Sequence, residues 1–236
     1  MQQAQEFAES QKHSLPQQFV VETLDSISNA LSESGFAVIT PEYNYLFETD
    51  LVSALENIAV SLGDEAYEAA HVGRIDQRQR NAQIRSDEIN WVTGSELATR
   101  AYLGTMERLR QHLNERLFLG LFEFESHFAR YGEGAFYKRH RDSFNGGRNR
   151  VLSSVLYLNP DWRADQGGEL VIYDPDDGRQ LGMVSPEFGT LVLFLSEIFP
   201  HEVLPAMRTR FSLAGWFRIN QATVSAAKPA KKQKRK

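Results

Sequence analysis

The sequence predicts an α+β, mainly β fold in which helices of the N-terminal half support a jelly-roll core. Two observations support this prediction. Apolar residues recur at helical spacing up to residue 117, whereas from residue 121 onward short segments rich in Val, Leu, Phe and Tyr alternate with Gly, Asn, Pro and Asp turns. The 236 residues suffice for one sizeable core. We expect one domain over residues 1–226, with helical support at about 15–118, a jelly-roll core at about 121–219 and a basic, disordered tail at 227–236.

The helical half begins with residues 15–34, where apolar side chains fall on one helical face and a glycine ends the pattern. A short apolar strand is predicted at residues 36–39, and helical spacing returns at residues 48–62. Residues 97–117 predict a long helix packed on a sheet. Between the last two helices, residues 71–86 are polar and rich in arginine without a period that would bury them, so we expect a mobile surface loop.

The C-terminal half is predicted to contain only β-structure. Eight short strands that follow a helical section are typical of a jelly-roll barrel buttressed by helices. The predicted strands are residues 122–131, 137–141, 151–158, 169–173, 179–184, 190–195, 201–203 and 210–219.

The sequence contains no cysteine, which excludes disulfides, zinc–thiolate sites, iron–sulfur clusters and thiol nucleophiles. Any metal must therefore be held by His, Asp or Glu. The N-terminus is polar and no apolar run approaches the roughly 20 residues that a membrane span needs. We expect a cytoplasmic protein without membrane contact.

The net charge of −5 hides an asymmetry. The last nine residues carry six of the 26 basic residues, which leaves 20 basic and 31 acidic residues, a net charge of −11, in the rest of the chain. Such a tail could touch RNA by counterion release, but a solvated terminus is the commoner explanation. The acidic body argues against nucleic acid as the main ligand.

His140 and Asp142 lie two residues apart on a predicted strand, so both side chains leave the same face. His201 begins another predicted strand near the far end of the barrel. Two imidazoles and one carboxylate make the facial triad that leaves positions open on iron(II), as oxygen activation requires. A His-x-Asp pair is a weak signal alone, and the residues after His201 strengthen it.

Arg210 follows His201 by nine residues, at the head of the last predicted strand. Its planar guanidinium can hold a carboxylate through two hydrogen bonds and stays charged at any working pH. Ser212, Ala214 and Trp216 share its face of the strand, and two of them are small, as expected where a co-substrate fills the barrel. The residues predicted to pack outward are Phe211, Leu213 and Phe217.

Several short motifs between residues 84 and 217 carry a family resemblance. They are Ile84-Arg85-Ser86-Asp87 with Trp91, Tyr131-Gly132, Tyr137-Lys138-Arg139-His140-Arg141-Asp142, Tyr157-Leu158-Asn159 with Trp162, Gly167-Gly168-Glu169-Leu170, and Pro200-His201-Glu202-Val203 with Pro205 and Arg210. On these motifs the chain resembles the prolyl-hydroxylase branch of the iron(II)/2-oxoglutarate oxygenases, which includes the hypoxia-inducible-factor prolyl hydroxylases and bacterial relatives. The resemblance implies the double-stranded β-helix, the cupin-like jelly-roll core of that superfamily.

The resemblance also implies roles for individual residues. It makes His140, Asp142 and His201 the metal ligands and Arg210 the anchor of the far carboxylate of 2-oxoglutarate. The tyrosines implied at the co-substrate are Tyr157, as a second hydrogen-bond partner of that carboxylate, and Tyr131, beside the metal-chelating end.

On the substrate side the resemblance implies Trp216 and Arg150. Arg85 with Asp87 would help to position a loop that folds over a bound peptide, and the arginine-rich residues 71–83 fit that loop. One departure bears on Arg150: the segment from the first metal ligand to Tyr157 is one residue longer than the animal pattern, with a turn at residues 145–147.

The implied activity is prolyl 4-hydroxylation of a protein, coupled to conversion of 2-oxoglutarate and oxygen to succinate and carbon dioxide. Iron(II) and 2-oxoglutarate are the implied cofactor and co-substrate, with ascorbate as a reductant. The bacterial members imply elongation factor Tu as the partner that carries the target proline.

The residues alone leave two rival functions open. An oxygenase acting on another side chain or on a small molecule would use the same triad, because the triad and Arg210 do not name a substrate. A cupin-like binding protein without catalysis would share the barrel. It has no need, however, for both an intact triad and an anchoring arginine.

Other polar and aromatic residues are interpreted structurally. The remaining histidines lack a carboxylate at ligand spacing and are interpreted as surface or structural residues: His13, His71, His112 and His127. Barrel packing explains Phe136 and Tyr137, and Trp91 and Trp162 are either core aromatics or functional residues. Arg85 and Asp87 have the alternative explanation of a surface ion pair. The acidic run Asp174, Asp176 and Asp177 is interpreted as a hairpin turn and not as a calcium loop.

Overall fold

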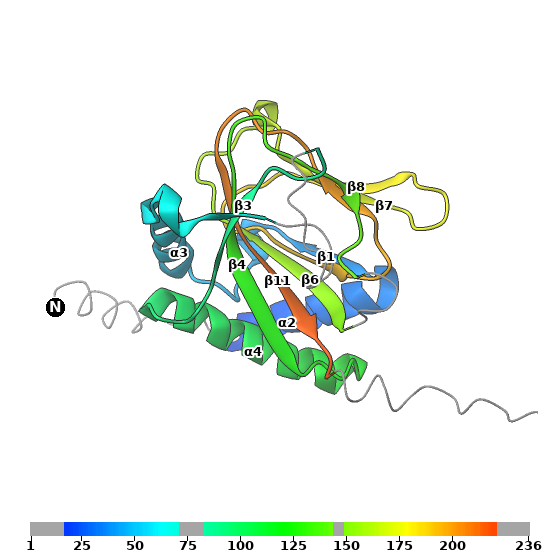
Figure 1. The fold of residues 1–236 in the computed structure, drawn as a ribbon. Helices are drawn as coiled ribbons and strands as arrows, with labels where there is room; N and C mark the ends of the chain where they lie inside the picture. The colour runs from blue at the N-terminus through cyan, green and yellow to red at the C-terminus, as the bar shows by residue number, and fades with distance from the viewer. Residues whose placement is uncertain (1–16, 71–82, 144–148, 221–236) are drawn as a thin grey trace, which may run out of the picture.

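Two antiparallel sheets face each other in the computed structural model, and helices cover the outer face of the larger sheet (Figure 1). The structure describes residues 17–70, 83–143 and 149–220. The predictions for His13 and His71, for the basic tail, for the turn at residues 145–147 and for most of the arginine-rich loop lie outside the described residues. The extent of the single domain also stays a prediction.

The larger sheet has seven strands in the order β1-β9-β6-β11-β4-β3-β2, and the smaller has four in the order β5-β10-β7-β8. The strands of the larger sheet are β1 (Phe36–Ile39), β2 (Glu68–Ala69), β3 (Glu88–Trp91), β4 (Glu123–Tyr131), β6 (Arg150–Tyr157), β9 (Leu191–Leu195) and β11 (Arg210–Arg218). The strands of the smaller sheet are β5 (Tyr137–His140), β7 (Leu170–Tyr173), β8 (Gln180–Val184) and β10 (His201–Val203). The eight strands predicted in the C-terminal half and the short strand before them are therefore confirmed.

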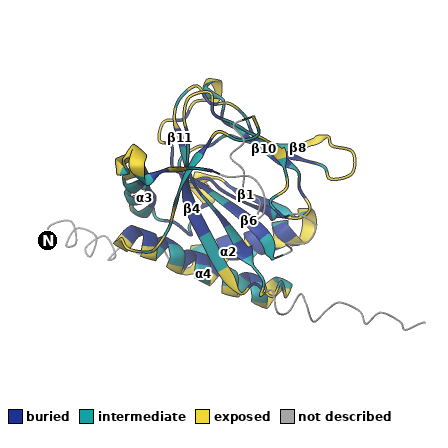
Figure 2. Cartoon of the chain, viewed as in Figure 1, coloured by how far each residue is buried: buried dark blue, intermediate teal, exposed yellow. Residues whose placement is uncertain are grey.

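Within the described ranges, three helices form the support: α2 (Gln17–Ser34), α3 (Thr49–Ser61) and α4 (Leu97–Leu117). Short 3-10 turns lie at Pro41–Tyr43, Asp64–Ala66 and Ala164–Gln166. The helices α2 and α4 run along the outer face of the larger sheet (Figure 1), and their inner faces are buried while their outer faces are exposed (Figure 2). All three helices agree with the prediction to within two residues at each end.

The main hydrophobic core lies between these helices and the larger sheet. It joins side chains from α2, α3 and α4 to apolar residues of β4, β6, β9 and β11. Phe211, Leu213 and Phe217 of β11 belong to this core or pack against it, as predicted. Burial of these apolar faces away from water is the dominant favourable contribution to folding.

A second, smaller core lies between the two sheets. It includes Ala129 and Tyr131 of β4, Ile172 of β7, Phe194 of β9 and Val203 of β10. Because side chains alternate along a strand, each strand of the larger sheet sends one set of residues to the helices and the other set into the space between the sheets. The candidate site occupies part of that space.

The strands β2 and β3 were not predicted. β3 covers only four residues of mixed polarity, and β2 covers two, so neither shows an alternation that can be recognised in the sequence. They form because the backbone of β3 pairs with that of β4, which places Trp91 opposite His127. None of the helices in the described ranges is long and apolar enough to cross a membrane.

Candidate active site

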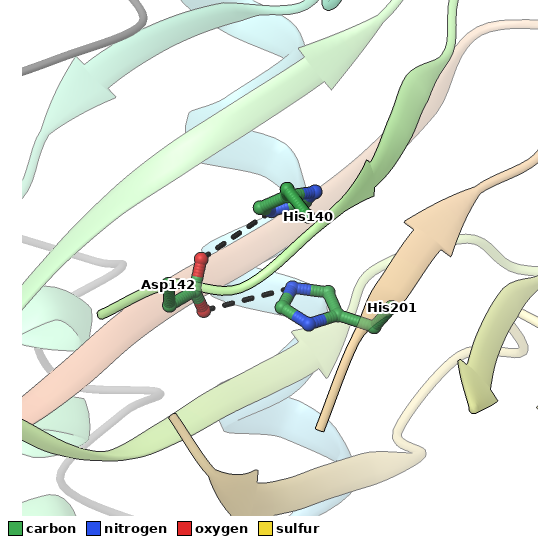
Figure 3. Close-up of side chains that lie close together, drawn as sticks. All are labelled: His140, Asp142 and His201. Carbon is green, nitrogen blue, oxygen red and sulfur yellow. Dashed lines mark ion pairs between the residues drawn. The ribbon is translucent and has the colours of Figure 1, made fainter. Parts of the chain in front are cut away.

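His140, Asp142 and His201 converge at one end of the smaller sheet. His140 is the last residue of β5, His201 is the first residue of β10, and the two pair directly across the strands. Asp142 lies just past the end of β5, and not within a strand as predicted, yet its carboxylate lies between the two imidazoles (Figure 3). One ligand atom from each of the three residues lies within 4.8 Å of the others, an arrangement that could hold a metal ion.

Backbone carbonyls orient both imidazoles. Nδ1 of His140 lies 2.8 Å from the carbonyl oxygen of Lys138, and Nδ1 of His201 lies 3.1 Å from that of Phe199. Because a carbonyl can only accept, Nδ1 donates in each case, which leaves Nε2 as the nitrogen that can bind a metal. These Nε2 atoms lie 3.4 Å and 3.7 Å from the carboxylate oxygens of Asp142, so both face the carboxylate.

The carboxylate of Asp142 is held by a hydroxyl and by the two imidazoles. Ser153 Oγ donates to Asp142 Oδ2 at 2.6 Å and is itself 2.8 Å from Ser196 Oγ. Burial tends to raise the pKa of Asp142, but His201, His140 and Ser153 outweigh burial and hold that pKa well below its usual range. Burial, with a smaller contribution from His140, lowers the pKa of His201 to about 4. Asp142 is therefore ionised and His201 neutral at physiological pH, the forms in which each binds a metal.

An ion pair and an aromatic ring support His140 from one side. The ring of Tyr137 stacks on the His140 imidazole with centroids 3.4 Å apart, and the guanidinium of Arg85 lies 4.2 Å from the Tyr137 ring. Arg85 in turn makes two hydrogen bonds to Asp87, of 2.7 and 2.5 Å. The Asp87 side chain is fully buried and both residues line the cavity, so the alternative of a surface ion pair is wrong.

Arg210 lies deeper in the same cavity. It is 1% exposed, and its Cζ lies 4.9 Å from the ring centres of both Tyr131 and Tyr157. Within the described residues, Arg210 forms no salt bridge, and neither its Nε nor the Tyr157 hydroxyl has a hydrogen-bond partner. A buried charge without a counter-ion is costly, so this corner of the cavity fits a carboxylate.

Burial raises the pKa of both tyrosines, and Arg210 opposes that shift at each. Both phenols therefore stay protonated and able to donate a hydrogen bond. Tyr131 lines the cavity, whereas Tyr157 is buried against Arg210 and is not among the lining residues.

The Gly167-Gly168 motif allows Arg210 to pack closely against the neighbouring turn. Gly168 has φ +74°, and a Cβ on it would come within 3.2 Å of Arg210 Cδ and within 3.0 Å of Ala206 Cβ. The buried indole of Trp162 donates to the carbonyl of Gly167 at 3.1 Å. Trp162 is thus a core aromatic that stabilises the wall behind Arg210.

The cavity continues outward from the triad to a second group of predicted residues. Trp216 and Arg150 line it together, with the Arg150 guanidinium 3.6 Å from the centre of the Trp216 ring. Glu125 accepts a 3.0 Å hydrogen bond from Arg150 Nη2 and a 2.7 Å bond from Arg218 Nη1. The predicted substrate-side residues therefore share one cavity with the triad and with Arg210.

The sequence did not assign every residue of the cavity wall to the site. Among those it missed are Trp91, His127 and Tyr137. His127 was interpreted as surface or structural, but it is 3% exposed and faces the cavity from β4. Its position four residues before Tyr131 was a usable signal, because residues at even spacing on a strand share a face. Two other structural interpretations agree with the structure: His112 pairs with Asp25 at 3.1 Å, and Asp174 accepts backbone hydrogen bonds in the β7–β8 turn.

Comparisons with known proteins agree with this arrangement. A family model described as the 2OG-Fe(II) oxygenase superfamily matches residues 126–218. The chain is 39% identical to a Pseudomonas putida prolyl-4-hydroxylase of known structure, with a TM-score of 0.74, over 84% of this chain and 99% of that one. It is 31% identical to human Egl nine homolog 1 over 172 residues, which cover 66% of this chain and 40% of that protein.

The chain thus spans about two fifths of the length of that curated relative. A Trichoplax adhaerens prolyl hydroxylase, whose structure contains a peptide fragment of the hypoxia-inducible-factor oxygen degradation domain, matches with a TM-score of 0.76 over 90% of this chain and 95% of that one. At 24% identity that likeness shows the fold alone. Together these comparisons confirm the predicted double-stranded β-helix.

Proposed function

Since the chain belongs to the 2OG-Fe(II) oxygenase superfamily, we propose that it is a prolyl 4-hydroxylase that uses iron(II) and 2-oxoglutarate to hydroxylate a protein. One observation carries this proposal. The cavity that contains the His140, Asp142 and His201 cluster also contains Arg210, a buried guanidinium without a salt bridge in the described part of the chain. An oxo-dicarboxylate that chelates a metal needs both a set of metal ligands and an anchor for its far carboxylate, and this cavity contains both.

The donor set of the cluster fits iron(II). Two imidazole nitrogens and one ionised carboxylate oxygen would hold the ion and leave coordination positions for other ligands. Bound there with 2-oxoglutarate and oxygen, the iron supplies the oxidising power for hydroxylation of a C–H bond. We assign His140, Asp142 and His201 as its ligands.

The other residues of the site bind 2-oxoglutarate or orient a metal ligand. Arg210 holds the far carboxylate of 2-oxoglutarate, and the protonated hydroxyl of Tyr157 donates to the same carboxylate. Tyr131, which lines the cavity opposite Arg210 in the β4–β11 register, lies beside the chelating end. Ser153 keeps the Asp142 carboxylate in one orientation through its 2.6 Å hydrogen bond.

The substrate in this proposal is a proline within a polypeptide. Trp216 and Arg150 form the outer part of the cavity, where a peptide reaches the metal, and Arg85 with Asp87 holds the wall beside β5. The likeness at 39% identity to a bacterial protein described as a prolyl-4-hydroxylase supports proline as the target. Elongation factor Tu is the first candidate, since the resemblance to bacterial members of the branch implies it. A cytoplasmic location, where that protein resides, and ascorbate as the reductant complete the proposal.

Turnover of purified components tests the proposal. The protein is incubated with iron(II), 2-oxoglutarate, ascorbate and elongation factor Tu, and succinate is measured together with the mass of every proline-containing fragment. We expect succinate to form and one proline to gain the mass of one oxygen atom. Succinate with the oxygen on another residue would contradict the assignment to proline, and no succinate with any substrate would contradict the assignment as an oxygenase.

Variants of the cluster test the metal assignment. His140→Ala or Asp142→Ala should abolish succinate formation while the circular dichroism spectrum stays unchanged, because neither residue belongs to a hydrophobic core. His112→Ala is the matched control, since His112 lies on α4 and pairs with Asp25 away from the cavity. Full turnover by His140→Ala would show that the metal assignment is wrong.

A further inference from the structure

The outer end of the cavity contains a buried imidazole without a hydrogen-bond partner. His127 lies on β4, is 3% exposed and lines the cavity. Its ring packs edge-on against Trp91, with centroids 5.2 Å apart, and tilted against Trp216, at 5.4 Å. Buried polar groups are nearly always hydrogen-bonded in folded proteins, so an exception calls for an explanation.

A second unpartnered group lies beside the first. Within the described residues, Nδ1 of His127 and Nε1 of Trp216 are both buried and both lack a partner. Ala214 of β11 pairs with His127 across the strands, and Trp216 comes two residues later on the same face of β11. Both atoms are enclosed by the protein, so a ligand in the cavity cannot reach either of them unless a side chain moves.

The imidazole of His127 is uncharged at physiological pH. Burial lowers its pKa to about 3, with Arg85 and Arg150 acting in the same direction and Asp87 and Asp142 opposing them. A neutral imidazole offers one N–H donor and one lone pair. Because Nδ1 is enclosed by the protein, Nε2 is the nitrogen left to meet a ligand.

The hydrogen-bonding groups at this end of the cavity match a proline-containing peptide. The Arg150 guanidinium, which lines this end of the cavity, can only donate. A prolyl residue has no backbone N–H, so the main chain around it presents carbonyl acceptors. Donors in the wall therefore meet acceptors in the peptide, and His127 adds a donor that carries no charge.

We propose that His127 is a specificity-determining residue that donates from Nε2 to a main-chain carbonyl beside the target proline, next to the Trp216 ring and the Arg150 guanidinium. This role rests on the proposed function, because it requires a prolyl peptide in the cavity. It adds to that function a residue on β4 that selects the substrate and takes no part in holding the metal or 2-oxoglutarate.

Two substitutions separate this role from simple packing between the indoles. His127→Phe keeps an aromatic ring between Trp91 and Trp216 but removes both nitrogens. His127→Gln loses the ring but keeps an N–H donor. The probe is the peptide of elongation factor Tu, or of whichever protein the wild type hydroxylates, that contains the modified proline.

The measurements are KM and kcat for that peptide, its Kd with manganese(II) in place of iron, and the Kd of 2-oxoglutarate. We expect His127→Phe to raise KM and Kd for the peptide about tenfold, the usual effect of one lost hydrogen bond in a specificity pocket, with the Kd of 2-oxoglutarate unchanged. His127→Gln should recover most of the peptide affinity. His112→Phe, outside the cavity, should match the wild type.

The outcomes distinguish this role from the function on which it rests. The reverse order, in which His127→Phe behaves as wild type and His127→Gln loses affinity, would assign His127 to packing and overturn the proposal. So would unchanged peptide binding in both variants. If the wild type hydroxylates no prolyl peptide, the proposed function fails and this role fails with it.

Discussion

Arg210 brings a full positive charge into the protein interior without a carboxylate from the described chain to balance it. Its neighbours there are the rings of Tyr131 and Tyr157, which offer only weak electrostatic compensation. The effective cost of burying such an ion is several kcal/mol. In the proposed function, the chain bears this cost in the ligand-free state and recovers it when the 2-oxoglutarate dianion binds.

The first prediction concerns this residue. Arg210→Met should raise the Kd of 2-oxoglutarate at least about 30-fold, since loss of one partner of a buried charge pair costs about 2 kcal/mol or more. The same substitution should raise the melting temperature of the ligand-free protein, because it removes an uncompensated buried charge. Calorimetric titration and thermal denaturation measure the two effects. An unchanged Kd would show that Arg210 is not the anchor.

The second prediction concerns His127 and pH. Its pKa is about 3 in the folded protein, against 6.5 for the unperturbed side chain, so between these values the unfolded chain binds a proton that the folded chain does not. The free energy of unfolding should therefore fall as pH drops below 6.5, by up to about 1.4 kcal/mol per pH unit from this residue.

Denaturant unfolding of the wild type and of His127→Phe at several pH values checks this prediction. The variant should lose less stability between pH 6.5 and pH 4.5, because it has one fewer proton to take up on unfolding. His112→Phe serves as the control. Parallel curves for the wild type and His127→Phe would contradict the buried, neutral imidazole.

Sequence motifs predicted the metal ligands and the carboxylate anchor of the site, but not His127. His140, Asp142, His201 and Arg210 stand in short motifs with defined spacing, so the sequence was enough to select them. His127 belongs to no such motif. It takes part in the cavity because β3, β4 and β11 lie side by side, and that neighbourhood arises only on folding.

At the scale of elements, β11 forms the middle of the larger sheet and pairs with β6 on one side and β4 on the other. Its close contact with β4 depends on Gly215, where a Cβ would come within 2.6 Å of Phe124 Cζ and 2.7 Å of the Glu125 carbonyl oxygen. Phe124 is itself packed on Phe217, with ring centroids 4.6 Å apart. The ring has little room to move aside.

The third prediction follows from this contact. Gly215→Ala should destabilise the protein by about 1–3 kcal/mol, the usual cost of overpacking. It should also weaken peptide binding, because the next residue along the strand is Trp216. Gly182→Ala on β8 is the matched control, since a Cβ there meets nothing within 4 Å. Equal melting temperatures for the two variants would contradict the close packing of β11 on β4.

The elements differ in how well their sequences predict them. The helix α4 begins and ends where its apolar spacing does, because 21 residues give the pattern several turns in which to repeat. The strand β3 has four residues and owes its conformation to the neighbouring strand β4. Long, amphipathic elements can be recognised locally, whereas short strands depend on partners distant in the sequence.

At the scale of the whole molecule, the two hydrophobic cores have separate tasks. The larger core packs the helices against the sheet, while the smaller core lies between the sheets, beside the proposed metal ligands. The three proposed ligands belong to neither core. Loss of the metal should therefore leave the fold intact.

The fourth prediction tests this separation. Treatment with a chelator should abolish succinate formation, and added iron(II) should restore it, while the circular dichroism spectrum stays the same throughout. Manganese(II) with 2-oxoglutarate should then raise the melting temperature, since a ligand at 100 times its Kd stabilises the folded state by about 2.7 kcal/mol. Loss of helical signal on chelation would show that the metal is needed for folding.

The strand β11 also sets the spacing between two parts of the cavity. Arg210 and Trp216 stand six residues apart on the same face, about 20 Å along a strand that rises about 3.3 Å per residue. Hydrogen bonds to strands on both sides prevent this backbone from stretching or slipping. The strand thus works as a gauge: a group bound at Arg210 and a peptide bound at Trp216 would be kept a fixed length apart, because neither end of the strand can shift relative to the other.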